Sequence, residues 1–164
     1  MNTPPRVGIL ADDLTSAADG AGPFVDRGLS ARVGRSCLPM VNADVFAIDT
    51  RSRSVGQRAA IETTQKFTTS LKNAEILYKT VDSTLRGHVR AEIGAALKAS
   101  GRKKLVFAPA FPEAGRTTRN GIQLVDGIPV DQSAYARDPV HPTTTSALAD
   151  LVPSNARSAF LLDA

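Results

Sequence analysis

The chain has 164 residues, of which 42% are hydrophobic and 22% are charged, and this size and balance are typical of one soluble globular domain with a core of its own. Its net charge of +4 comes from scattered basic residues without interleaved aromatic residues, so nucleic-acid binding is not expected. No apolar stretch is long enough for a signal peptide or a membrane span, and the lone Cys37 excludes a disulfide framework, so a cytoplasmic protein is expected.

Apolar runs alternate with amphipathic segments over the first two thirds of the chain. Asp12 or Asp13 is predicted to cap the helix that follows the first run, and Gly28 to end it. Ser54 and Gln57 have the spacing of a capping box, which predicts a second helix as far as about residue 71. A third helix is predicted over residues 88–100, and strands are predicted at residues 6–11, 31–34, 44–49, 75–81 and 104–110. Strands separated by helices predict a three-layer α/β fold, with a mainly parallel sheet and helices on both faces.

The character of the sequence changes after Phe111. Residues 111–121 form a polar stretch with proline and glycine, which predicts a long loop. Asp126 and Gly127 lie between two apolar runs, so a small β-hairpin is predicted near residues 121–131. A short helix is predicted at residues 143–152, and a strand over the terminal stretch "SAFLLDA".

Polar side chains follow several strands of the predicted sheet at the point where each strand ends. Ligands bind beyond the carboxyl ends of the strands in open parallel sheets, so these side chains predict a polar pocket. Lys79 stands out because it lies within an apolar strand, where an ammonium group needs a partner. The candidate substrate-binding residues are Asp12, Asp13, Arg53, Lys79, Asp82, Ser83, Arg86, Pro112 and Arg116, and the candidate catalytic residues are Asp12, Asp13 and Asp82.

Each of these residues also has an ordinary structural interpretation. Asp12, Asp13 or Asp82 could act only as a helix cap, Arg86 only as an ion-pair partner, and Arg116 only as a solvated side chain. Their joint placement favours a site for a small, anionic, polyhydroxylated ligand, because guanidinium groups bind carboxylates and aspartates accept hydrogen bonds from sugar hydroxyls. The sequence has neither a phosphate-binding G-x-x-x-x-G-K-[ST] loop nor metal-ligand spacing, so no metal site is predicted.

The stretches that carry these residues resemble the four-carbon acid sugar kinase family, specifically its N-terminal domain. The matching stretches are "ADDLTSAAD", "DTRSR", "YKTVDSTLRG", "APAFPEAGRTTRNG", "VDGIPV" and "ARDPVHPTTTS", which together cover nearly the whole chain. Ser16 stands where the family usually has glycine, and Arg51 where glutamate is common, which predicts a shifted substrate preference. The resemblance implies that residues 1–164 are the sugar-acid-binding domain of a kinase for threonate, erythronate or 3-oxo-tetronate.

The resemblance also implies a C-terminal nucleotide-binding domain, which is absent from this sequence. ATP and Mg²⁺ are expected for a full-length family member, whereas neither is expected to bind to this domain alone. The chain by itself is therefore expected to be an inactive kinase fragment whose partners are a small sugar acid and the missing domain, with a homodimer as a possible assembly. One alternative is a non-catalytic sugar-acid-binding remnant or sensor. A haloacid-dehalogenase-type phosphatase is a weaker alternative, because Asp12 and Asp13 are adjacent rather than separated by one residue.

Overall fold

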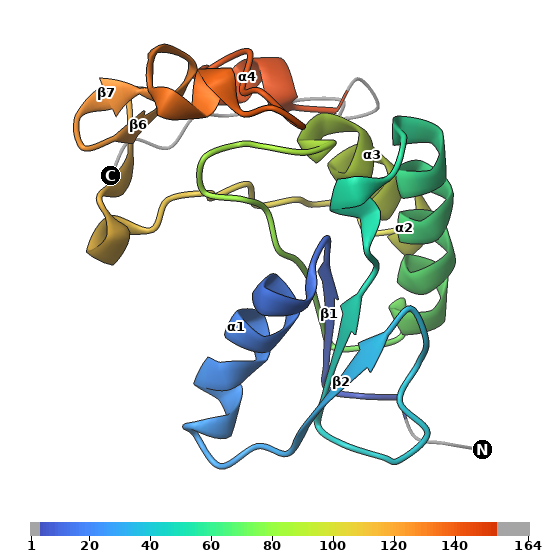
Figure 1. Cartoon of the computed structure of the whole chain (residues 1–164). Coiled ribbons are helices and arrows are strands. Elements are labelled where there is room, and N and C mark those ends of the chain that lie inside the picture. The colour runs from blue at the N-terminus through green and yellow to red at the C-terminus, as the bar shows by residue number, and fades with distance from the viewer. Residues whose placement is uncertain (1–3, 154–164) are drawn as a thin grey trace. The chain divides into compact units, whose positions relative to one another are not determined.

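The computed structural model describes residues 4–153 (Figure 1). The chain divides into two compact units that are interleaved in sequence. Unit 1 contains the residues up to Thr80 together with Ala95–Lys103, and unit 2 contains Val81–Gly94 and the residues from Lys104 onward. The helix α3 (Val89–Ser100) has residues in both units and is followed by Gly101, as predicted.

Unit 1 is built on a four-stranded parallel sheet with the strand order β2-β3-β1-β4. The strands are β1 (Val7–Ala11), β2 (Ala31–Arg35), β3 (Val45–Asp49) and β4 (Ile76–Lys79), so four of the five predicted parallel strands are confirmed. The register pairs Ala11 with Asp49 and Leu10 with Lys79, which brings the carboxyl ends of β1, β3 and β4 to one edge of the sheet.

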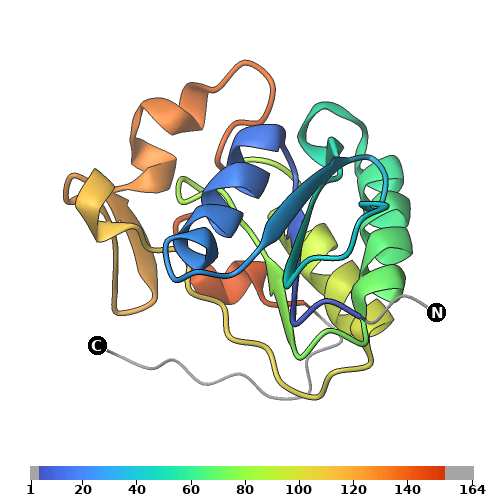
Figure 2. The same cartoon turned by 90° about the horizontal axis from the view of Figure 1, so that it is seen from below.

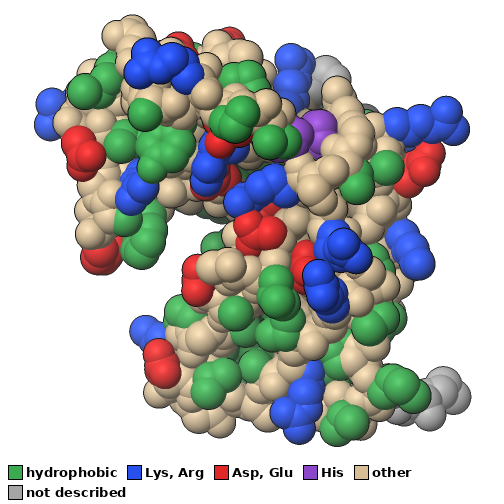
Figure 3. All heavy atoms as spheres, viewed as in Figure 1, with side chains coloured by type: hydrophobic (Ala, Val, Ile, Leu, Met, Phe, Trp, Pro, Cys, Tyr) green, Lys and Arg blue, Asp and Glu red, His purple; other side chains and the backbone are tan. Residues whose placement is uncertain are grey.

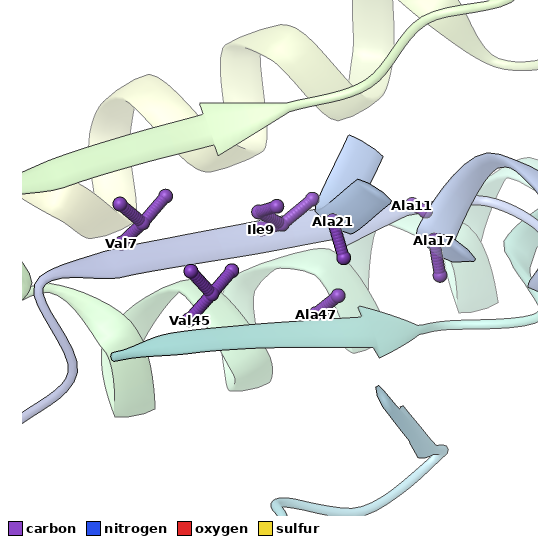
Figure 4. Packing of buried hydrophobic residues seen from close by; sticks show 7 residues of the cluster. All are labelled: Val7, Ile9, Ala11, Ala17, Ala21, Val45 and Ala47. Carbon is purple, nitrogen blue, oxygen red and sulfur yellow. The ribbon is translucent and has the colours of Figure 1, made fainter. Parts of the chain in front are cut away.

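Helices cover both faces of this sheet, as the alternation of side chains along the strands requires. Figures 1 and 2 show α1 (Leu14–Val25) on one side of the sheet and α2 (Gln57–Leu71) on the other. Figure 4 shows the buried cluster on the α1 side, whose members are Val7, Ile9, Ala11, Ala17, Ala21, Val45 and Ala47. The cluster on the α2 side contains Leu10, Phe46, Ile48, Phe67 and Leu71. The three-layer arrangement predicted from the sequence is therefore present in unit 1.

The ends of α1 show how the chain enters and leaves the first helix. Asp13, rather than Asp12, is the N-cap, and its carboxylate accepts a hydrogen bond of 2.7 Å from the backbone N–H of Ser16. The helix ends at Val25, and Gly28 follows with φ +83° while its N–H donates to the carbonyl of Val25. Gly28 therefore provides the left-handed residue of the turn that stops the helix.

The capping box predicted for α2 is wrong. Ser54 belongs to a 3₁₀ turn, Ser52–Ser54, and the N-cap of α2 is Gly56, which has no side chain to donate or accept. Ser54 is therefore unavailable as the N-cap, and the 3₁₀ turn places Arg53 beside the end of β1.

The strand predicted at residues 104–110 is also wrong, since no regular structure is assigned there. Leu105 and Val106 are exposed in this segment, with Val106 at 88%. The apolar composition predicted burial, but a strand also needs a neighbour with which to form a hydrogen-bonded ladder. Within the described residues the segment has no such neighbour.

Unit 2 contains a three-stranded antiparallel sheet, made of β5 (Arg116–Arg119), β6 (Ile122–Val125) and β7 (Ile128–Pro129). The predicted hairpin is confirmed as the β6–β7 pair, joined by Asp126 and Gly127 at φ +49° and +81°. Asn120 and Gly121, which join β5 to β6, also have two positive φ values in succession, at +50° and +73°. Both turns have the backbone signs of a type I′ hairpin.

The other elements that the structure describes after β7 and directly before β5 in unit 2 are short. Three 3₁₀ turns are present at Pro112–Ala114, Val130–Gln132 and Ala134–Arg137, and the predicted helix near residue 148 is only the four-residue α4 (Leu148–Leu151). The predicted strand "SAFLLDA" lies outside the described residues. On the face of the molecule drawn in Figure 3, basic side chains are widely distributed and acidic side chains lie among them.

Candidate functional site

Arg53 binds two aspartates at the carboxyl edge of the parallel sheet. Its Nε donates to Oδ2 of Asp12 at 2.7 Å and its Nη2 to Oδ1 of Asp12 at 2.9 Å, while its Nη1 lies 2.6 Å from Oδ2 of Asp13. The Asp12 side chain is 7% exposed and the Arg53 side chain 26%. Asp12 and Arg53 are 41 residues apart in sequence and meet because β1 and β3 are neighbouring strands. We call Asp12, Asp13 and Arg53 the Arg53 cluster.

The loop after β3 fixes the position of Arg53. The Thr50 hydroxyl donates to the carbonyl of Ala11 at 2.7 Å and lies 2.8 Å from the Ser52 hydroxyl. Arg51 has φ +56°, a left-handed conformation that is uncommon for arginine, and its N–H donates to Asp49 Oδ1. These bonds turn the chain sharply after β3, so that Arg53 faces the end of β1.

Lys79 is at the end of β4, beside β1 in the register that pairs it with Leu10. Its Nζ donates to the carbonyl of Thr80 at 2.7 Å. The backbone N–H of Thr80 in turn donates to Leu10 at 2.8 Å. Lys79 is half-buried and lies at the same edge of the sheet as the Arg53 cluster, as the sequence predicted.

Asp82 organises a second polar cluster, in unit 2. Its Oδ2 accepts from the Thr84 hydroxyl at 2.6 Å and from Arg86 Nε at 2.6 Å, and the backbone N–H of Arg86 is 3.3 Å away. Leu85 and Gly87 adopt positive φ values of +61° and +89°, which fold the chain tightly around the Asp82 carboxylate. The charged and hydroxyl side chains of "DSTLRG" therefore stabilise this turn by hydrogen bonding to one another.

Asp138 holds Arg86 from the other side. Its Oδ2 lies 3.3 Å from Arg86 Nη1, and its Oδ1 accepts from the backbone N–H groups of His141 at 2.8 Å and Val140 at 3.0 Å. The bond from the His141 N–H is the main cause of the lowered pKa of Asp138. The hydrogen bond to Asp82 is the main cause of the raised pKa of Arg86. We call Asp82, Arg86 and Asp138 the Arg86 cluster.

Arg116 and Tyr135 lie next to each other in the same unit. Arg116 Nη2 donates to the Tyr135 hydroxyl at 2.9 Å, and Nη1 donates to the carbonyl of Ala114 at 2.5 Å. The guanidinium carbons of Arg86 and Arg116 lie 5.2 and 6.0 Å from the centre of the Tyr135 ring, which is the range of cation–π contacts. One tyrosine therefore contacts two of the arginines that were predicted as site residues.

Two predicted site residues make few side-chain contacts. The carbonyl of Ser83 accepts from Gln123 Nε2 at 2.8 Å, but the Ser83 hydroxyl forms no hydrogen bond with any described residue. Pro112 is exposed at the start of the 3₁₀ turn before β5. Tyr135 and Asp138 were not predicted as site residues, although Asp138 lies within the stretch "ARDPVHPTTTS" and Tyr135 directly before it. A carboxylate followed by proline is a frequent turn signal, and this could have identified Asp138.

Asp138 makes the stability of unit 2 depend on pH. Its pKa is lowered from 3.8 in the folded chain, so below about pH 3.8 the unfolded chain binds more protons than the folded chain. The stabilisation is therefore complete above this pH and is lost as the pH falls through the lowered pKa. We expect Asp138→Asn to destabilise the protein more at pH 6 than at pH 3, as measured by urea unfolding. An equal loss of stability at both pH values would contradict this expectation. The pKa of Asp44 is also lowered, but its contribution cancels in the comparison because both proteins retain Asp44.

A parallel sheet with ion-paired arginine and aspartate side chains at its carboxyl edge is the framework of a domain that binds small polar ligands. Residues 7–163 match the family described as sugar-binding N-terminal domain, and the chain belongs to this family.

The relatives of the chain are named as kinases of four-carbon acid sugars. It is 41% identical over 158 residues to the D-threonate kinase of Bordetella bronchiseptica, covering 90% of this chain and 39% of that protein. It is 35% identical over 167 residues to the D-erythronate kinase of Heliobacterium modesticaldum, covering 93% of this chain and 36% of that protein. The chain therefore spans less than two fifths of the length of these two relatives.

A solved structure supports the same fold. The crystal structure of a Bordetella bronchiseptica protein with bound citrate, described as a domain-swapped dimer, matches with a TM-score of 0.83 and 40% identity. The match covers 90% of this chain and 39% of that chain.

Two further observations concern only the residues that the structure describes. None of their helices is both long and apolar enough to cross a membrane. Nor do residues 4–153 bring together three or more histidine, cysteine, aspartate or glutamate side chains that could hold a metal ion. The catalytic and binding roles of the individual site residues, and the expected cytoplasmic location, stay predictions.

Proposed function

We propose that this chain is the acceptor-binding part of an ATP-dependent kinase that phosphorylates a hydroxyl group of a four-carbon acid sugar such as threonate, erythronate or 3-oxo-tetronate. The observation that carries the proposal is the Arg53 cluster, which lies at the carboxyl ends of two adjacent parallel strands. Membership of the sugar-binding family and the names of the relatives support the choice of ligand class.

Each of the two clusters contains groups that can bind a part of such a ligand. Guanidinium and ammonium groups attract the carboxylate of an acid sugar, and aspartate oxygens and serine hydroxyls bind its hydroxyl groups. In this proposal Arg53 and Lys79 supply positive charge in unit 1, and Arg86 and Arg116 supply it in unit 2. Asp12, Asp13 or Asp82 orients the reacting hydroxyl and accepts its proton, which is the usual role of a carboxylate in phosphoryl transfer to an alcohol.

ATP and Mg²⁺ are expected to bind to a part of the kinase outside these residues. This expectation is supported by the lack of a G-x-x-x-x-G-K-[ST] loop in the sequence and by the length of the relatives named as kinases, of which the chain spans less than two fifths. When bound, the nucleotide supplies the phosphoryl group. The alternative of a non-catalytic sugar-acid sensor shares the binding site and differs only in lacking turnover. The comparisons offer no support for the phosphatase alternative.

Ser83→Ala tests the proposed site with little disturbance of the fold, because the Ser83 hydroxyl has no hydrogen-bond partner among the described residues. We expect the 164-residue chain to bind D-threonate or D-erythronate in calorimetry, and to bind threitol, which lacks the carboxylate, much more weakly. Ser83→Ala should lower the affinity for the acid by about two- to tenfold, the value of one hydrogen bond.

The melting temperature should stay unchanged in this variant. Ser70→Ala is the matched control, since its exposed hydroxyl donates only to the carbonyl of Lys66 within α2. The absence of binding to any four-carbon acid at millimolar concentration would overturn the proposed function.

A further inference from the structure

Arg116 differs from the other arginines of the candidate site in having no carboxylate partner. Arg53 is paired with Asp12 and Asp13, and Arg86 with Asp82 and Asp138. No acidic side chain among the described residues forms an ion pair with Arg116, although its side chain is half-buried. A guanidinium group keeps its charge at every physiological pH, so partial burial without a counter-charge is unfavourable.

The hydrogen bonds of Arg116 are incomplete as well. A guanidinium group has five N–H donors, and two of them are used, by Ala114 and Tyr135, which leaves three. Its Nε atom is buried and has no hydrogen-bond partner among the described residues. Arg116 therefore has an uncompensated charge, and its Nη1 and Nη2 atoms each keep one unused N–H donor, a combination that suits a bound anion.

The backbone of Tyr135 is held firmly, which allows its side chain to position Arg116. The N–H of Tyr135 donates to the Ser133 hydroxyl at 3.2 Å, and its carbonyl accepts from the N–H of Thr143 at 3.0 Å. The ring also lies 5.2 Å from the guanidinium carbon of Arg86, which two carboxylates fix in place. The hydroxyl of this ring then accepts the hydrogen bond from Arg116.

We propose that Arg116 is the residue that binds the carboxylate of the acid-sugar acceptor, and that Tyr135 is its positioning residue. Within unit 2, Arg86 then serves mainly to orient Asp82, which binds a hydroxyl group. This assignment rests on the proposed function. It adds to that function by assigning the carboxylate to Arg116 among the four candidate cations and by giving Tyr135 a role. It also implies selectivity for acids over the corresponding alcohols at Arg116.

The first test compares two arginines of β5. Arg116→Gln removes the proposed carboxylate ligand, whereas Arg119→Gln changes an exposed arginine of the same strand and is the matched control. We expect Arg116→Gln to weaken D-threonate binding by about ten- to a hundredfold, the range for a charge-assisted hydrogen bond. Arg119→Gln should stay within about twofold. Equal affinities of the parent and Arg116→Gln would overturn the inference while leaving the proposed function intact.

The second test remains decisive if Arg116→Gln fails to fold. The Nε–H resonance of Arg116 in the parent chain should shift on titration with D-threonate and not with threitol, and an unshifted resonance during saturable binding would overturn the inference. Tyr135→Phe keeps the ring and should weaken acid binding by about two- to tenfold, and Tyr135→Leu should weaken it further. If the parent binds no four-carbon acid, the proposed function and this inference both fail.

Discussion

Arg53→Ala is expected to lower the free energy of unfolding of unit 1 by about 2–4 kcal/mol. The replacement leaves the Asp12 carboxylate, which is 7% exposed, close to Asp13 without the guanidinium that both carboxylates bind. Removing one partner of a buried ion pair costs about 3–5 kcal/mol because the remaining charge is still shielded from water. The Arg53 side chain is 26% exposed, so the expected cost is somewhat lower than for a fully buried pair. Native-state hydrogen exchange of the β1 and β3 amides measures this loss in unit 1 alone.

Arg58→Ala is the matched control for this substitution. Arg58 also pairs with a carboxylate, Glu62, but its side chain is 93% exposed, on the surface of α2. An exposed pair of this kind contributes less than about 1 kcal/mol, so the exchange rates of β1 should hardly change. Similar losses in the two variants would mean that the Arg53 cluster is an ordinary surface network.

The chain alone is expected to release no ADP when it is supplied with ATP, Mg²⁺ and D-threonate or D-erythronate. Phosphoryl transfer depends on holding the donor phosphates in line with the acceptor hydroxyl, and the chain spans only 39% of a related D-threonate kinase. Turnover should appear when this chain replaces the matching part of the Bordetella bronchiseptica enzyme, because the acceptor site then faces a nucleotide. A coupled ADP-release assay measures turnover by the chain alone and by the chimera.

Asp82→Asn in the chimera should lower turnover by about 10²- to 10⁴-fold if Asp82 is the proton acceptor. The same substitution at Asp12 and at Asp13 decides among the three carboxylates. ADP release by the chain alone that disappears in Asp12→Asn would contradict the division of labour, because a nucleotide site would then lie within these residues. An inactive chimera that still binds the acid would favour the sensor alternative.

The parallel sheet could be predicted from the sequence because burial and strand formation coincide there. β1 and β3 are buried at every position, so their apolar composition alone marks them. Residues 104–110 have a similar composition but form no strand, since composition does not reveal whether a pairing neighbour exists. The β5–β6 turn was missed for a different reason: Asn120 and Gly121 are a strong hairpin signal, but β5 has polar residues throughout and reads as a loop.

The candidate site could be predicted only as a set of residues. Strand ends identified Asp12, Arg53 and Lys79 because parallel topology gathers them at one edge. Which arginine pairs with which aspartate depends on the register between strands, and on Asp138, which is 52 residues from Arg86. The lack of a carboxylate partner for Arg116 among the described residues is likewise a property of the folded chain and has no sequence signature.

The interleaving of the two units constrains how the protein is made in the cell. Unit 1 needs Ala95–Lys103 in addition to the residues up to Thr80, so a ribosome must release the chain beyond Lys103 before that unit can be completed. Translation proceeds at about 5–20 residues per second, so β1 and β3 wait about a second or more with incomplete partners. A nascent-chain series should therefore show protease resistance of unit 1 only in lengths that expose Lys103. For the same reason, cutting the gene after Thr80 would separate unit 1 from its second segment, Ala95–Lys103.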